Sequence, residues 1–196
     1  MSQWTVVIAS GPSLRRADCD LLRGVGYTIA VNNAVVFAPW ADELFGGDRQ
    51  WWLYYGWRVA WFKGHRVSKT FKDPGVEQWT ARGWPRTGGN SGHMAIMRAV
   101  DRGGLNIAIL AFDQQVPTEG ENAGKVHFHG DHPHVLDKDG RRMLGNAEGI
   151  ANWPRLMAQT ARALVNRGVR VVNLSRESAL DCFERMTPEH FLETEI

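Results

Sequence analysis

The sequence predicts an α/β fold, a single-domain, doubly wound and mainly parallel sheet flanked by helices. Three observations carry this prediction. Short runs of apolar and β-branched residues alternate with segments of helical periodicity, as in consecutive βα units. Two of the runs, residues 106–111 and 169–173, are apolar and uninterrupted, which is typical of central strands covered on both faces. A length of 196 residues suits one domain spanning residues 1–196.

The predicted elements alternate along the chain. Strands are expected at residues 5–9, 27–31, 43–46, 65–70, 106–111 and 169–173. Helices are expected at residues 14–22, 48–62, 93–102 and 152–167. The last helix has the clearest start, because Asn152 can cap it and Pro154 suits its first turn. Ser13 is the expected cap of the first helix, and either Asn90 or Ser91 that of the third.

Composition sets few limits on function. The chain is 43% hydrophobic with a net charge of +2, which is not the strongly basic balance that would by itself indicate nucleic-acid binding. Cys19 and Cys182 are too few for a disulfide framework and too far apart for a local metal site, so both are expected as reduced thiols. No signal-peptide or membrane-span pattern occurs, so we expect a cytoplasmic protein with no membrane contact; an oligomer is left open.

Tryptophan is concentrated in one part of the chain. Seven of the nine tryptophans lie between Trp40 and Trp84, several of them in the helix expected at residues 48–62. They could form a packed face against the sheet or an exposed platform for bases and rings. Packing is favoured because large aromatic side chains are mostly core residues.

The first strand runs directly into a short turn, Ser10-Gly11-Pro12-Ser13, ahead of a helix. Gly11 permits close backbone approach, and the free N–H groups of a helix start suit an anion. Strand, glycine and helix also follow one another where no ligand binds, so this motif alone is weak. A second turn, Gly89-Asn90-Ser91-Gly92, precedes the third helix and is either another anion site or a plain capped helix start.

Polar residues follow several predicted strands. Asn32 and Asn33 come after the second strand, Asp48 after the third and Asp113 after residues 106–112. The carboxyl edge of a parallel sheet is where open α/β proteins bind ligands, so these side chains are candidates for reading a base or ribose. For both aspartates, helix capping is the alternative.

The segment of residues 114–149 is rich in Gly, Asp, His and Asn and lacks sustained periodicity, so we expect an active-site loop. Four of the seven histidines, His127, His129, His132 and His134, fall within eight residues. They could bind a metal, supply a general base on a phosphate-binding lid, or lie on a solvated loop. No second ligand cluster completes a zinc signature, so no metal ligands are assigned and a base is favoured.

These motifs, in this order, resemble those of the bacterial sialyltransferases with the glycosyltransferase family 42 fold. They also resemble the related domain of the archaeal 6-hydroxymethyl-7,8-dihydropterin pyrophosphokinases, and most closely small proteins of phage and prophage genomes. The shared pattern is Ala9 to Leu14, Asn32-Asn33, Trp40-Ala41-Asp42, Asp48, Gly89-Asn90-Ser91-Gly92, Phe112-Asp113, His129-Gly130-Asp131-His132-Pro133 and Val172-Asn173-x-Ser175.

The resemblance implies a nucleotide site and a histidine base. By position the nucleotide contacts would be Ser10, Gly11, Pro12, Ser13, Asn32, Asn33, Asp48, Asn90, Ser91, Gly92, Asp113 and Gln115, where Gln115 stands in place of a phosphate-binding tyrosine. His132 would be the base, with His129 as its rival and Asp131 between them as a further catalytic candidate.

The function expected from this sequence is nucleotide-dependent transfer, with a nucleotide-sugar as donor, an unknown acceptor hydroxyl and no certain cofactor. One alternative is pyrophosphate transfer from ATP, in which Asp48, Asp113 or Asp131 would hold Mg²⁺. Another is a phage protein that binds a nucleotide without catalysis. Modified DNA is a further hypothesis for the acceptor, with the Trp-rich helix as a platform for bases. A phage-encoded protein would act in the cytoplasm of its bacterial host.

Overall fold

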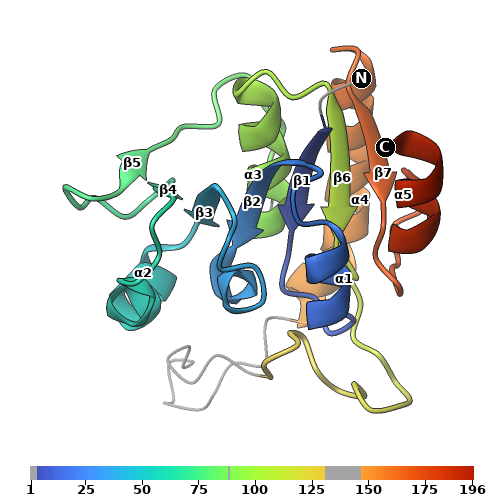
Figure 1. Cartoon of the computed structure of the whole chain (residues 1–196), viewed down its shortest axis with the longest axis horizontal. Helices are drawn as coiled ribbons and strands as arrows, with labels where there is room; N and C mark the ends of the chain where they lie inside the picture. Colours follow the sequence, from blue (N-terminus) through green and yellow to red (C-terminus); the bar gives the residue numbers. More distant parts are fainter. Residues whose placement is uncertain (1–3, 88, 131–146) are drawn as a thin grey trace.

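The computed structural model describes residues 4–87, 89–130 and 147–196. Its centre is an eight-stranded sheet in which every strand pair is parallel, in the order β5-β4-β3-β2-β1-β6-β7-β8 (Figure 1). The strands are β1 (Trp4–Ile8), β2 (Gly26–Val31), β3 (Glu43–Gly46), β4 (His65–Ser68), β5 (Glu77–Gln78), β6 (Asn106–Leu110), β7 (Arg170–Asn173) and β8 (Glu184–Arg185). The predicted α/β fold with a doubly wound parallel sheet is confirmed.

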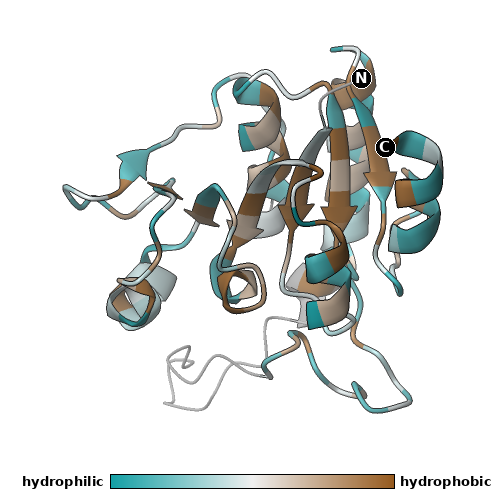
Figure 2. Cartoon of the chain, viewed as in Figure 1, coloured by the Kyte–Doolittle hydropathy of each residue, from teal (hydrophilic) through white to brown (hydrophobic). Residues whose placement is uncertain are grey.

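Helices cover both faces of the sheet (Figure 1). They are α1 (Arg16–Leu21), α2 (Arg49–Tyr55), α3 (Ser91–Asp101), α4 (Ala147–Val165) and α5 (Pro188–Glu195), with 3₁₀ turns η1 (Asn32–Val36) and η2 (Gly56–Val59). Successive side chains of a strand point to opposite faces, so β1 contributes to two cores. Val6 and Ile8 pack with residues of α1, α2 and α5, while Val7 packs with residues of α3 and α4. Strands buried on both faces are mostly apolar, as Figure 2 shows for β1 and β6, in which Thr5 and Asn106 are the polar residues.

The structure corrects several predicted boundaries. The helix expected at residues 152–167 begins earlier, at Ala147, so Asn152 is not its N-cap and Pro154 lies inside it. The helix expected at residues 48–62 ends at Tyr55 and continues only as the short turn η2. The first helix begins at Arg16, with no side-chain cap. Among the described residues no helix is long and apolar enough to cross a membrane.

A buried ion pair fixes α3 to one half of the sheet. The Glu43 carboxylate on β3 is fully buried, and the guanidinium of Arg98 on α3 lies 3.1 Å from it. The same guanidinium lies 2.8 Å from Glu77 on the short strand β5. One arginine thus ties α3 to β3 and β5, which places the N-terminus of α3 at the carboxyl edge of the sheet.

Candidate functional site

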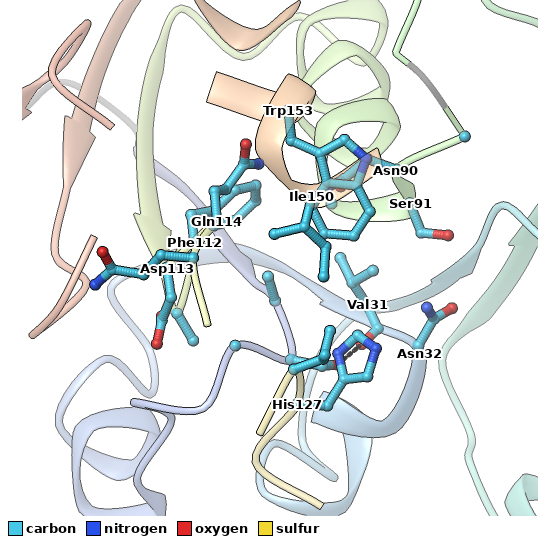
Figure 3. A pocket seen from close by; sticks show the side chains of 18 of the residues that line it. Val31, Asn32, Asn90, Ser91, Phe112, Asp113, Gln114, His127, Ile150 and Trp153 are labelled. Atoms are coloured by element: carbon cyan, nitrogen blue, oxygen red, sulfur yellow. Dashed lines mark hydrogen bonds between the residues drawn. The ribbon is translucent and has the colours of Figure 1, made fainter. Parts of the chain in front are cut away.

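The strand order creates a switch point at the centre of the sheet. Strands β1 to β5 are added in one direction, whereas β6, β7 and β8 are added on the other side of β1. The connections that leave the carboxyl ends of β1 and β6 therefore diverge, which opens the crevice where doubly wound folds bind ligands. A cavity of about 190 Å³ lies there (Figure 3).

Residues from several separate parts of the chain line this cavity. Nine of the predicted site residues are among them: Ser10, Gly11, Asn32, Asp48, Asn90, Ser91, Gly92, Asp113 and Gln115. The lining also includes residues that were not assigned as nucleotide contacts or catalytic residues, although Ala9, Gly89, Phe112 and His127 belong to the motifs described above: Ala9, Val31, Trp51, Gly89, Ala111, Phe112, Gln114, Val126, His127, Ile150 and Trp153. The topology thus brings most of the predicted polar residues to one place.

The turn after β1 is held by the residues that follow β6. The backbone amides of Ala9 and Gly11 donate to Leu110 and Ala111 at 2.8 and 3.0 Å. A Cβ on Gly11 would collide with the Ala111 carbonyl and the Asp113 carboxylate, so only glycine fits this approach.

Ser13 and Asp113 bind each other. The backbone N–H and the hydroxyl of Ser13 donate to the two carboxylate oxygens of Asp113, each at 2.7 Å. Ser13 therefore does not cap α1, and neither Ser13 nor Pro12 lines the cavity. Burial raises the pKa of Asp113 to about 6, although the Ser13 hydrogen bonds act in the opposite direction.

The two asparagines after β2 have different surroundings. The side-chain oxygen of Asn33 accepts a 2.7 Å hydrogen bond from the indole N–H of Trp51, and Asn33 does not line the cavity. Asn32 does line it. Its buried Oδ1 has no hydrogen-bond partner among the described residues.

Backbone strain coincides with the cavity. Within the described part of the chain, three residues other than glycine have positive φ: Asn32 at 52°, Ala111 at 58° and Gln114 at 50°. All three line the cavity. A left-handed conformation costs an L-residue on the order of 1 kcal/mol or more, and such strain clusters at ligand sites. The buried Oε1 of Gln114, like Oδ1 of Asn32, lacks a partner among these residues.

The N-terminus of α3 forms another wall. Asn90, one of the two caps expected, caps the helix by accepting a 2.9 Å hydrogen bond from the His93 amide. The Ser91 hydroxyl accepts from the Gly47 amide at 3.2 Å, which ties α3 to the connection after β3. A Cβ on Gly92 would lie 3.0 Å from the Phe112 ring, so this helix start packs closely against the residues after β6.

Asp48 has a structural partner as well as a place at the cavity. Its carboxylate accepts a 2.9 Å hydrogen bond from the Gln50 amide and so caps α2. Among the described residues, no three His, Cys, Asp or Glu side chains are grouped where they could hold a metal ion.

One histidine of the loop reaches the cavity in the described residues. His127 lines it, and its ring hydrogen-bonds the backbone of Ser10 (Figure 3). The Phe128 amide donates to the Ser10 carbonyl at 3.1 Å, so this part of the loop is attached to the β1 turn. Burial lowers the pKa of His127 to about 4, which keeps the imidazole neutral at neutral pH. His129 stacks on His127 with ring centroids 5.2 Å apart and does not line the cavity.

The other predicted catalytic residues, Asp131 and His132, lie outside the described residues, so their roles stay predictions. Prediction missed the contribution of α4, from which Ile150 and Trp153 face the cavity opposite His127 (Figure 3). The indole Nε1 of Trp153 is buried and has no hydrogen-bond partner in the described residues. Both positions fall in or near a helix that was expected only to pack against the sheet, and nothing in their spacing marked them.

No protein-family model matches this chain, and a search of the curated proteins finds no match. The family resemblance of the motifs therefore stays a prediction.

Proposed function

We propose that this protein is a nucleotide-dependent transferase that moves a sugar from a nucleotide-sugar to an acceptor hydroxyl. The observation that supports this proposal best is the position of the cavity at the switch point between β1 and β6, with the N-terminus of α3 in its wall. Doubly wound folds bind nucleotides at this position, and a helix N-terminus attracts phosphate through its free amides and its dipole.

The lining suggests how the donor would be held. The backbone at Ser91 and Gly92 would take the phosphate, while the amide groups of Asn32 and Gln114 would hydrogen-bond the base or ribose. Trp153 offers an aromatic ring and an indole N–H on the opposite side. The cavity of about 190 Å³ is smaller than the ~300–1,000 Å³ of most ligand pockets, so it suits one ring system. The rest of the donor would extend beyond it.

The proposed reaction is a direct displacement. The acceptor oxygen forms a bond to the anomeric carbon as the bond between that carbon and the nucleotide phosphate breaks. The hydroxyl proton passes to an imidazole, and the negative charge that develops on the leaving phosphate is stabilised at the start of α3. His132 is the base in this proposal. His127 is neutral and adjoins the cavity, so it can accept a hydrogen bond from the acceptor.

A thermal-shift screen of CMP, UDP, GDP, ADP and their sugar conjugates, each with and without Mg²⁺, tests the donor site. A bound nucleotide at ~100 times its Kd should stabilise the fold by ~2.7 kcal/mol. Asn32→Ala should reduce that shift, because it removes the amide group that lacks a protein partner. Asn166→Ala, at an exposed position in the turn after α4, is the matched control and should leave the shift unchanged. If no nucleotide of the panel shifts the melting temperature, the proposed donor site is wrong.

His132→Ala separates binding from catalysis. It should retain nucleotide binding and lose ~10²–10⁴-fold in turnover with the donor that the screen identifies. Full activity in this variant would show that His132 is not the base. Nucleotide binding without turnover on any acceptor would favour the non-catalytic alternative, and a strict Mg²⁺ requirement would favour pyrophosphate transfer.

A further inference from the structure

Three large apolar side chains form an exposed stripe on α2, η2 and the turn after them. Leu53 is 50% exposed, Trp57 71% and Trp61 46%. They are spaced four residues apart in sequence, one in α2, one in the 3₁₀ turn η2 and one in the turn that follows it. We call these three residues the aromatic stripe. Trp51 and Trp52 of the same helix are buried, so one part of the Trp-rich segment packs in the core while another faces solvent.

Arg58 makes cation–π contacts with aromatic rings next to the stripe. The guanidinium of Arg58 lies 4.9 Å from the ring centroid of Trp57 and 4.4 Å from that of Tyr54. Such an arrangement presents a flat aromatic surface together with fixed positive charge. Both features suit a ligand that combines planar rings with anionic groups.

The charge of the chain is strongly segregated around the stripe. From Arg49 to Lys72 there are six Lys and Arg residues and no Asp or Glu, although the whole chain carries a net charge of only +2. Three of these cations, Arg49, Arg58 and Lys63, are exposed and adjoin the stripe in sequence. None of the three forms an ion pair with a carboxylate in the described part of the chain. The segment from Arg49 to Lys72 is therefore more basic than the chain as a whole, between the exposed residues Asp48 and Asp73.

We propose that the aromatic stripe and its flanking cations bind single-stranded nucleic acid. Exposed bases stack on aromatic rings, while lysine and arginine contact the phosphates between them, and this combination does not depend on base sequence. A single strand is favoured over a duplex because its bases are free to stack. An anionic membrane is a poorer match, since Leu53 is the stripe's only aliphatic side chain.

The first residue of the stripe is close in sequence to residues that line the cavity. Asp48 and Trp51, at the start of α2, line the cavity, and Leu53 follows two residues later. A strand bound along α2 would therefore pass near the candidate site. The binding proposal does not require the transferase proposal, because it rests on charge and exposed rings outside the cavity.

Fluorescence anisotropy with labelled dT₂₀ tests the proposal. The protein should bind the oligonucleotide at 20 mM salt, and binding should weaken as salt is raised, by ~0.7 in log Kd per unit of log salt for each phosphate contact. Trp57→Ala combined with Trp61→Ala should weaken binding by at least about fivefold, since stacking contributes ~1–3 kcal/mol per base. Arg58→Gln with Lys63→Gln should weaken it and also reduce the slope against salt.

Matched variants elsewhere on the surface serve as controls. Val165→Ala removes an apolar side chain that is 71% exposed, and Arg23→Gln removes an exposed cation; neither should change the affinity. The melting temperature of every variant should stay close to that of the parent, because each altered side chain is exposed. The proposal is overturned if dT₂₀ does not bind at 20 mM salt, or if the double Trp variant binds it as the parent does. Duplex DNA bound as tightly as dT₂₀, or anionic vesicles bound more tightly, would overturn it as well.

Discussion

Replacing Asp113 with asparagine tests how the turn after β1 is held. The Asp113 carboxyl is buried, with 1% of its surface exposed, and accepts two 2.7 Å hydrogen bonds from Ser13. Burial nevertheless raises its pKa from 3.8 to about 6, because removing a carboxylate from water disfavours its charged form. Asparagine keeps the shape of the side chain and removes the titration.

The sign of the effect follows from proton binding. Between pH 3.8 and about 6 the folded protein holds a proton on Asp113 that the unfolded chain has released, so the free energy of unfolding falls as pH rises. This loss is complete above the folded pKa. A pKa difference of this size corresponds to about 3 kcal/mol over the whole range, of which about 2 kcal/mol falls between pH 4.5 and 7.5. The asparagine side chain of the variant does not titrate, so the variant does not lose this part of its free energy of unfolding as pH rises.

Urea denaturation of the parent and Asp113→Asn at pH 4.5, 5.5, 6.5 and 7.5 measures the effect. The stability of the variant relative to the parent should rise by about 2 kcal/mol from the lowest to the highest pH. Other groups that titrate in this range, including His93 and His127, are present in both proteins and cancel in the difference. A constant difference between the two proteins across this range would refute the conclusion that burial dominates the Asp113 environment.

Gly92→Ala places a methyl group 3.0 Å from the Phe112 ring and should lower the free energy of unfolding by about 1–3 kcal/mol in urea titrations. A variant as stable as the parent would show that the Phe112 ring moves to make room for the methyl group. Arg98→Ala leaves the buried Glu43 carboxylate without its main partner and should destabilise by about 3–5 kcal/mol in thermal unfolding, whereas a loss below about 1 kcal/mol would contradict this. Burial lowers the pKa of His93 from 6.5 to about 4, so its contribution to stability is complete above pH 6.5 and is lost as pH falls to 4. His93→Gln should flatten that decline between pH 7 and 5, and an unchanged slope would rule the group out.

Strong local patterns predicted the sheet well. Uninterrupted apolar runs identified β1, β6 and β7, and the alternation with helices gave the parallel topology. The strands β5 and β8 are two residues long and have no periodicity that could reveal them. They pair with β4 and β7, the strands that directly precede them in the chain, through two residue pairs each, and so short a pairing leaves no pattern in the sequence.

The error at α4 has a specific cause. Proline is most common in the first turn of a helix, where its missing N–H is not needed, so Pro154 predicts a helix start nearby. In the structure the helix begins at Ala147 and continues through Pro154. The earlier start places Ile150 in the helix and at the cavity, whereas Trp153, inside the predicted helix, lines the cavity without any sequence signal.

Asn32 and Asn33 show why sequence could locate the site without assigning its side chains. They have the same chemistry and are adjacent, and both follow β2 at the ligand-binding edge. The side-chain oxygen of Asn33 accepts a hydrogen bond from the indole N–H of Trp51, which lies on α2, 18 residues later in the chain. Asn32 instead adopts φ of 52° and lies in the cavity with a buried oxygen that no described residue satisfies. A tertiary contact thus decides which amide supports the fold and which faces the cavity. This makes Asn32, rather than Asn33, the residue whose substitution should report on nucleotide binding.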